Sequence, residues 1–350
     1  MRGVISLGYW RAGLALRRSI VLCAMAVCLS SCGTPPANEA GRVKVSVCSS
    51  SSGGTQVVPL YALEKGIFGR YGLDVALTTI NSGSRAVVAL ISGSVQLCQL
   101  SGSAVGHAVA AGADAVIVGA LVDRYVYSLV VSPGIRSPSD LKGKAVAISA
   151  VGSASETAMR LALRTIGLRP DGDVAILSIG SQADRMAALE AGYVAGTLIS
   201  VPELTLAREK GFRVLLDLST MDLPSLHTGT VTSRAFLRGN RATVLNFMKA
   251  MTEAVFSIKR DRDGTLAVLG KYMQLDGQED AAALDETYVF LKRKLVDVPT
   301  PSRAGLEAML AEIARENPEA GRLTPHEIAD FGVVHQLEND GFFRELLGQK

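Results

Sequence analysis

The chain has 350 residues, of which 48% are hydrophobic and 20% are charged, and its formal net charge is +3. This length allows two lobes with cores of their own, because single hydrophobic cores stop growing at roughly 250–300 residues. The first 31 residues contain four arginines and no acidic residue, so 32 basic residues remain against 33 acidic ones. A balance this close to neutral indicates neither a nucleic-acid nor an anionic-lipid partner for the rest of the chain.

The first 31 residues have the parts of a secretory signal peptide. Arg17-Arg18 precedes an apolar segment from Ile20 to Leu29, which is followed by Ser30-Ser31-Cys32. The apolar segment is about half as long as a membrane-spanning helix, which argues against a permanent anchor of that kind. Leu-Ser-Ser-Cys resembles a bacterial lipobox, which implies cleavage before Cys32 and lipidation of that residue. The alternative is an ordinary cleaved signal with Cys32 merely nearby. Residues 32–42 are interpreted as a flexible tether.

Polar loops follow the predicted strands of the first half. Residues 43–48, 73–80 and 95–100 are predicted strands, because they are short apolar or alternating runs bounded by turn residues. A loop and then a helical pattern follow each strand, as in parallel α/β sheets that bind ligands at the carboxyl ends of their strands. The serine-rich loop 49–55 has a solvated linker as its alternative interpretation. The ligand-binding residues predicted in these loops are Ser51, Gly53, Gly54, Thr55, Ser82, Ser84, Ser101 and Ser103.

The second half contains the same arrangement. Ala145–Ile148 is a predicted strand, residues 151–156 form a polar loop, and apolar residues then recur at helical spacing as far as Ile166. Backbone N–H groups are unpaired at a helix N-terminus, where the macrodipole favours anions or strongly polar atoms. We therefore predict ligand contacts from Gly152, Ser153 and Ser155, with Ser200 opposite them.

Two extended segments are predicted to join the halves. Residues 123–125 lie between two strands where the chain leaves the first half, and residues 222–231 return to it. From residue 240 onward the pattern is helical and indicates a cap on the first half. Residues 89–95 and 188–194 are similar in sequence, which suggests two α/β lobes of similar build.

Some charged and aromatic residues near these loops have two interpretations. A guanidinium fork suits a sulfonate or carboxylate, so Arg85, Arg124 and Arg185 are candidate anion partners. For Arg85 and Arg185 the favoured interpretation is a solvated position on a helix. Residues of the joining segments either line a cleft or pack structurally, and these are Tyr125, Tyr127 and His227.

Cysteine and histidine spacing indicates neither a metal site nor a cofactor. Cys48 and Cys98 lie near the ends of predicted strands, and they pair if those strands are neighbours or else remain small buried side chains. The spacing matches no zinc motif, and the four histidines are scattered. We therefore assign no metal, and no cofactor is expected.

Several segments together resemble the nitrate/sulfonate/taurine class of ABC-transporter solute-binding proteins, the SsuA/THI5-like group. They are residues 137–144 (SPSDLKGK), Gly152-Ser153, residues 187–194 (AALEAGYV) and residues 202–212. The resemblance implies a type II periplasmic-binding-protein fold, with two doubly wound α/β lobes joined by two hinge strands and C-terminal helices packed on the first lobe. One departure is visible: members of this group often have an acidic residue where this chain has Gln96 and Ala195.

The expected protein is an extracytoplasmic solute-binding lipoprotein of an ABC importer. The expected divisions are residues 1–31 as signal peptide, 32–42 as tether, 43–127 plus 229–350 as lobe 1, and 128–228 as lobe 2. The resemblance implies an ABC permease and ATPase as partners, a small polar or anionic organic ligand, a monomer, and a membrane anchor through lipid on Cys32. The alternatives are a pyrimidine-synthesis or other secreted enzyme, and a ligand-sensing protein without transport. Against an enzyme, the sequence contains none of the common nucleophile, metal or phosphate-binding motifs.

Overall fold

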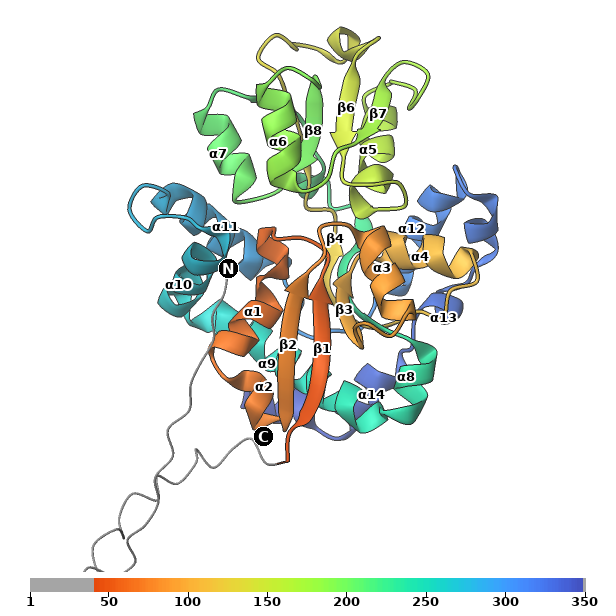
Figure 1. Ribbon diagram of the computed structural model, residues 1–350, viewed down its shortest axis with the longest axis vertical. Coiled ribbons are helices and arrows are strands. Elements are labelled where there is room, and N and C mark those ends of the chain that lie inside the picture. Colours follow the sequence, from red (N-terminus) through yellow and green to blue (C-terminus); the bar gives the residue numbers. More distant parts are fainter. Residues whose placement is uncertain (1–40, 349–350) are drawn as a thin grey trace, which may run out of the picture. The chain divides into compact units, whose positions relative to one another are not determined.

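The computed structural model describes residues 41–348, which belong to one compact unit (Figure 1). The predicted signal peptide, Cys32 and nearly all of the predicted tether lie outside the described residues. Within the described part, no helix is both long and apolar enough to cross a bilayer.

The first sheet has five strands in the order β2-β1-β3-β10-β4. β1, β2 and β3 are mutually parallel, whereas β10 runs antiparallel to both of its neighbours. β3 begins two residues later than the sequence predicts, because the backbone N–H of Val95 donates to the carbonyl oxygen of Ala89 in the preceding helix, residues 83–91. The strands are β1 (Val43–Ser49), β2 (Leu73–Thr79), β3 (Leu97–Leu100), β4 (Val116–Arg124) and β10 (Pro224–Thr232).

The second sheet has the equivalent strand order, β7-β6-β8-β5-β9. β6 pairs in parallel with β7 and β8, and β5 runs antiparallel to β8 and β9. The two sheets therefore share one topology, as the repeated sequence pattern suggests. The strands are β5 (Ser128–Val131), β6 (Ala145–Ile148), β7 (Ala175–Ser178), β8 (Gly196–Ile199) and β9 (Arg213–Asp217).

Helices connect successive strands and bury their apolar faces against each sheet. In the first lobe they are η1 (Gly54–Gln56), α1 (Val57–Glu64), α2 (Ile67–Arg70), α3 (Gly83–Ile91) and α4 (Gly102–Ala110). In the second lobe they are η2 (Pro138–Leu141), α5 (Ala154–Thr165), α6 (Gln182–Glu190), α7 (Glu203–Glu209) and η3 (Leu218–Thr220).

The helices after β10 pack on the first lobe. Phe247 and Met251 of α9 are buried in the same core as Tyr61 of α1, and Met309 of α12 is buried with Leu226 of β10. These helices are α8 (Arg234–Gly239), α9 (Arg241–Arg260), α10 (Arg262–Met273), α11 (Ala281–Lys294), α12 (Arg303–Ala314), η4 (Pro318–Arg322), α13 (Pro325–Ile328), α14 (Gly332–Asn339) and α15 (Phe342–Leu347).

The chain passes between the sheets twice. It leaves the first sheet after β4, enters the second at β5, and returns through residues 218–223 to β10, which pairs with β4. This confirms the predicted architecture of two doubly wound α/β lobes with two connections and helices packed on the first lobe. The residue limits of the lobes, 43–127 plus 229–350 and 128–228, remain a proposal.

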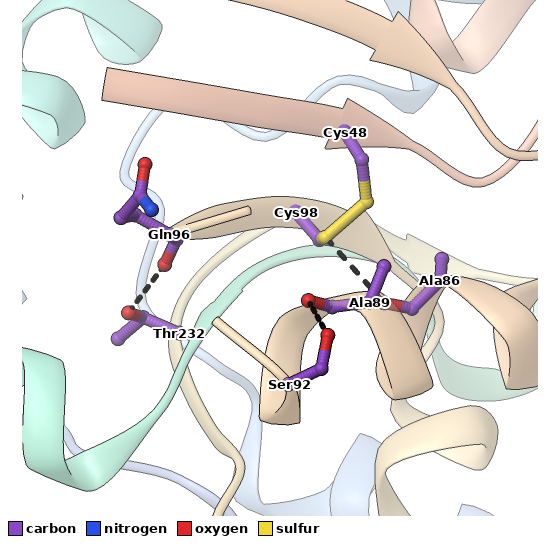
Figure 2. Close-up of a disulfide and its surroundings, with 7 residues drawn as sticks. All are labelled: Cys48, Ala86, Ala89, Ser92, Gln96, Cys98 and Thr232. Carbon is purple, nitrogen blue, oxygen red and sulfur yellow. Dashed lines mark hydrogen bonds between the residues drawn. A yellow bond between two sulfur atoms is a disulfide. The ribbon is translucent and has the colours of Figure 1, made fainter. Parts of the chain in front are cut away.

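Cys48 and Cys98 form a disulfide between neighbouring strands (Figure 2). They are directly opposite each other in the pairing of β1 with β3, with their Cα atoms 4.4 Å apart, and both side chains are fully buried. Of the two interpretations that the sequence leaves open, the structure has the paired one. The disulfide lies three residues before Ser51 and three before Ser101, so it ties together the strands that carry two of the predicted binding loops.

Candidate ligand-binding site

A polar cavity of about 40 Å³ lies where the carboxyl ends of strands from both sheets meet. Serines and small polar residues dominate its lining, and neither an Asp nor a Glu side chain is among the described residues that line it. The lining residues are Ser50, Ser51, Ser52, Gln56, Asn81, Gly83 and Ser101 from the first lobe, Ser149, Ser153, Ala154, Ser155, Gly180, Ser181, Gln182 and Arg185 from the second, and Tyr127 and His227 from the segments that join them.

Four helix N-termini face this cavity, because α3, α4, α5 and α6 each begin directly after a strand and its loop. Each helix has a serine at its N-cap, whose hydroxyl accepts a hydrogen bond from the backbone N–H three residues later. The earlier N–H groups of each first turn have no intrahelical acceptor, and the helix dipoles add positive potential at the same place. The N-cap residues are Ser82, Ser101, Ser153 and Ser181.

Three of these caps contain a second serine, two residues after the first. The two hydroxyl oxygens lie 3.0 Å apart in the Ser82/Ser84 pair, 3.1 Å in Ser101/Ser103 and 3.0 Å in Ser153/Ser155. Ser155 also accepts from the backbone N–H of Ser149, at 2.8 Å. The repeated Ser-x-Ser pattern therefore holds the loops in place, and only part of its hydrogen-bonding capacity remains for a ligand.

Arg185, on α6, places the one cationic side chain among the described lining residues into this cavity. It is only 2% exposed, and it donates to Thr197 Oγ1 (3.1 Å) and to the carbonyl oxygens of Gly180 and Leu198 (2.9 Å each). These bonds use three of its five N–H groups. No carboxylate of residues 41–348 forms an ion pair with it. Burial lowers the pKa of the guanidinium, although the charges of Glu203 and Asp184 nearby oppose that shift, and an anion in the cavity would stabilise the charged form further.

The expectation that Arg185 is a solvated helix residue is therefore wrong. Its equivalent, Arg85 on α3, is exposed as expected. Helical spacing alone does not distinguish these two positions. The difference arises because β8 of the second sheet supplies two acceptors for the guanidinium of Arg185. These acceptors are the hydroxyl of Thr197 and the carbonyl oxygen of Leu198.

Three ionisable groups around Arg185 have displaced pKa values because they are removed from water. Burial raises the pKa of Glu203, at the start of α7, to about 7, although the charge of Arg185 opposes that shift. Burial lowers the pKa of His227 to about 4, with a further contribution from Lys294. Burial also raises the pKa of Tyr127, whose ring packs edge-on against His227 at 5.0 Å between centroids. At neutral pH, His227 is therefore an uncharged lining group.

Gly53 and Gly54 form a close contact between the lobes. The backbone N–H of Gly54 donates to the carbonyl oxygen of Val201, at 3.4 Å. A Cβ atom on Gly53 would lie 2.7 Å from Gln182 Nε2, and one on Gly54 would lie 2.9 Å from Thr287 Cγ2 and 3.0 Å from the Val201 carbonyl oxygen. The close backbone approach of Val201 therefore favours glycine at position 54 in this closed arrangement, whereas a side chain at position 53 would displace the end of the Gln182 side chain.

The structure brings some of the predicted residues together at the cavity and places others behind it. Ser51, Ser101, Ser153 and Ser155 line the cavity. The others cap or brace the lining loops: Gly53, Gly54 and Thr55 are buried at the interlobe contact, Ser200 donates its N–H to Gln182 Oε1 at 2.8 Å, and Gly152 donates its N–H to Glu156. Ser82, Ser84 and Ser103 belong to the serine pairs described above, outside the lining.

Sequence reasoning missed several lining residues. Gln56 and Gln182 are buried, and Gln56 Oε1 has no hydrogen-bond partner among the described residues. Gln182 follows the N-cap Ser181 directly, so the capping pattern after the strand at 175–178 could have identified it. Gln56 follows the serine-rich loop, and no sequence signal separates it from an ordinary first-turn residue. Within residues 41–348, no three His, Cys, Asp or Glu side chains converge as metal ligands do.

Several proteins with solved structures have the same fold as this chain. The alkanesulfonate-binding protein SsuA from Xanthomonas axonopodis pv. citri, bound to MOPS, is 22% identical, with a TM-score of 0.69 over 83% of this chain and 96% of that chain. The periplasmic nitrate-binding protein NrtA from Synechocystis PCC 6803 is 12% identical, with a TM-score of 0.72 over 85% of this chain and 89% of that one. The desulfurization enzyme DSZB is 14% identical, with a TM-score of 0.62 over 85% and 99%. The fold is therefore the type II periplasmic-binding-protein fold.

At the level of sequence, no curated protein is significantly similar to this chain. The family model described as NMT1/THI5 like matches residues 55–261. That segment includes both connections between the lobes and all but Ser51, Gly53 and Gly54 of the predicted binding residues. Because the match spans more than half of the chain, the protein belongs to the NMT1/THI5-like family.

Proposed function

We propose that the protein is an extracytoplasmic solute-binding lipoprotein of an ABC importer, which captures a small organic anion in the cleft between its lobes. The membership in the NMT1/THI5-like family and the fold shared with SsuA and NrtA support a binding role. The resemblance of residues 29–32 to a lipobox supports anchoring through Cys32. Transport requires a permease and an ATPase as partners.

The main observation in support of an anionic ligand is the burial of Arg185 in the cavity lining. A buried guanidinium without a counter-ion is unfavourable, and two of its N–H groups remain for a ligand after the bonds to Thr197, Gly180 and Leu198. The helix N-termini at Ser101, Ser153 and Ser181 add donors and positive potential. A sulfonate or carboxylate group accepts bonds from both kinds of donor, so it satisfies the site better than a neutral solute does.

The small closed cavity supports a compact ligand. The cavity of about 40 Å³ is only slightly larger than the roughly 30 Å³ that one water molecule takes in the liquid, so the lobes must separate somewhat for any organic anion, least for a compact one and most for a large aromatic acid. Hydroxyl groups of Ser51 and Ser101 and the amide of Gln56 provide additional polar contacts on the first lobe. Binding of the ligand then shifts the equilibrium between open and closed arrangements of the lobes toward the closed one.

The enzyme alternative keeps some support, because the fold is shared with the desulfurization enzyme DSZB. In the cleft, however, His227 makes no hydrogen bond to a serine in the described structure, and a serine needs such a base to act as a nucleophile. A ligand-sensing role without transport uses the same cleft, and it differs only in the membrane partner.

The test is a binding screen on the purified protein that follows thermal stability and, for every hit, product formation. The panel contains alkanesulfonates, nitrate, small carboxylates, amino-pyrimidines and aromatic acids. We expect at least one small anion to raise the unfolding temperature and to be recovered unchanged. Conversion of that anion to a product would overturn the binding-protein assignment in favour of an enzyme. Stabilisation by amino-pyrimidines alone would contradict the anionic ligand.

A further inference from the structure

The second lobe is held against the first by charged groups on both sides of the cleft. The basic members lie on α5 and α7, in the second lobe, and the acidic members lie on α11 and α12, which pack on the first lobe. In Figure 1, α7 and α11 lie on one side of the molecule and α5 and α12 on the other. The two sets are independent of each other and of the residues that line the cavity.

On the α5 side, two arginines of the second lobe face Glu312 of α12 and Glu316, two residues beyond the end of that helix. Arg164 pairs with Glu312 and, at 3.2 Å, with Glu316, and Arg160 lies 3.5 Å from Glu316. The side chains of Arg160 and Glu312 are only 14% and 11% exposed, so solvent screens this network less than an ordinary surface pair. Arg160 is further fixed within its own lobe by Glu156, at 3.0 Å.

On the α7 side, a single glutamate of α11 accepts from two residues of the second lobe. Arg208 lies 3.0 Å from Glu286 Oε1, and Thr205 Oγ1 donates to Glu286 Oε2 at 2.5 Å. The Lys294 ammonium at the end of α11 donates to the carbonyl oxygen of Ser219, at 2.7 Å. Arg208 and Glu286 are 43% and 40% exposed, so this side is the weaker of the two.

Both acidic helices are fixed to the first lobe. Gly102 and Gly106 of α4 allow α12 to pack closely, because a Cβ atom at either position would lie within 3 Å of Met309 or Ile313. On α11, Leu291 is fully buried, and the backbone N–H of Val296, just beyond the helix, donates to Leu121 of β4. The ion pairs therefore resist movement of the whole second lobe and not of one loose helix.

We propose that α11 and α12 form a two-sided electrostatic latch that sets the equilibrium between open and closed lobes. The same helices carry the binding loops: α5 begins at the N-cap Ser153, and α7 begins three residues after Ser200. A ligand that binds at the start of α5 therefore moves the same rigid helix whose residues Arg160 and Arg164 pair with the glutamates of the first lobe. The latch favours closure even without ligand, and salt weakens it.

The test uses ligand-free protein, so its result does not depend on the proposed ligand. Small-angle X-ray scattering at low and high salt reports the separation of the lobes, and hydrogen exchange of residues 149–155 and 181–182 reports exposure of the cleft. Arg164→Glu and Arg208→Glu are each expected to increase the radius of gyration at low salt and to speed exchange at least severalfold, because each substitution removes an attraction and places carboxylates opposite each other.

The matched rescue variants exchange the charges, Arg208→Glu with Glu286→Arg and Arg164→Glu with Glu316→Arg. The rescue is expected to be larger for the first exchange, because Arg164 also faces Glu312. Arg169→Glu is the control, since its pair with Asp173 has the same 3.0 Å distance but lies within the second lobe. An unchanged radius and exchange rate in both single variants, or an equal change in Arg169→Glu, would overturn the latch. Failure of the Arg208/Glu286 exchange to restore either quantity would also contradict it.

Discussion

The backbone N–H of Gly54, in the first lobe, donates to the carbonyl oxygen of Val201, in the second, at 3.4 Å. This contact lies at the edge of a cleft to which α3, α4, α5 and α6 all present their N-termini. Because the two glycines at 53 and 54 have no side chains, the loop of the first lobe reaches Gln182 and Val201 directly. Closure of the lobes and assembly of the binding site therefore depend on the same few atoms.

Replacing Gly54 with alanine is expected to hinder closure without unfolding either lobe. The added Cβ would lie 3.0 Å from the Val201 carbonyl oxygen across the cleft, a distance that requires the lobes to separate slightly. It would also lie 2.9 Å from Thr287 Cγ2 on α11, in the first lobe, where the side chain has to shift. The dissociation constant of the best anion in the panel should rise at least severalfold, as calorimetry would measure. Gly239→Ala is the control, because nothing lies within 4 Å of the added atom. Equal affinities for all three proteins would show that this contact plays no part in binding.

Ser153→Ala is expected to reduce both stability and affinity. Loss of an N-cap hydroxyl costs about 1 kcal/mol of stability, and here it also loosens the helix start that faces the ligand. Ser233→Ala removes an equivalent cap from α8, away from the cleft. Urea unfolding should show similar losses for the two variants, whereas calorimetry should show weaker anion binding only for Ser153→Ala. Unchanged affinity in Ser153→Ala would exclude this helix N-terminus from the binding site.

Glu203 and His227 are expected to make opposing contributions to stability between about pH 4.5 and 6.5. The pKa of Glu203 is raised from 4.5 to about 7, so only the folded protein keeps this proton, and its contribution falls as the pH rises. The pKa of His227 is lowered from 6.5 to about 4, so only the unfolded chain takes up this proton, and its contribution is lost as the pH falls. The two effects largely cancel in the unmodified protein.

Single variants should reveal each contribution. Between about pH 5 and 6.5, the free energy of unfolding should rise by up to about 2 kcal/mol more in Glu203→Gln than in the unmodified protein, and fall by a similar amount in His227→Asn. Urea unfolding at the two pH values measures both changes. If the two variants had the same pH dependence, neither buried group would be linked to folding as described.

Loss of the Cys48–Cys98 disulfide is expected to lower stability by about 2–4 kcal/mol. The bond closes a loop between residues 50 positions apart, and its removal gives the unfolded chain more freedom. The double variant Cys48→Ala/Cys98→Ala, unfolded in urea, should match the unmodified protein unfolded in the presence of a reductant. If the reductant left the stability of the unmodified protein unchanged while the double variant lost stability, the effect would belong to packing and not to the disulfide.

Much of the fold could be predicted from local sequence, because most strands are short apolar or alternating runs, and β2, β3, β6 and β7 are each followed by a serine that caps the next helix. Loop 151–156 shows this best: its glycine and serines predict a polar loop at a helix N-terminus with ligand contacts, and in the structure α5 begins there, with Ser153 as its N-cap and in the cavity lining. The positions of the strands along the chain follow from the same pattern.

What local sequence could not provide were the consequences of which elements become neighbours. Cys48 and Cys98 pair because β3 lies beside β1, although β2 intervenes between them in the chain. Arg185 is buried because α6 packs on β8, which lies beside it only after the sheet forms. Gly53 and Gly54 allow the close contact between the lobes, and that contact forms only when two separately folded lobes close on each other.

The most direct test of the central claim compares each anion that binds with its neutral isostere, an alkanesulfonate with the corresponding sulfonamide or a carboxylate with its amide. Calorimetry is carried out on the unmodified protein, on Arg185→Gln and on the exposed counterpart Arg85→Gln. The unmodified protein should bind the anion but not its neutral isostere. The affinity should fall roughly 10- to 100-fold in Arg185→Gln, as for the loss of a charged hydrogen bond, and stay unchanged in Arg85→Gln. Equal binding of anion and neutral isostere, or unchanged affinity in a folded Arg185→Gln protein, would contradict the account.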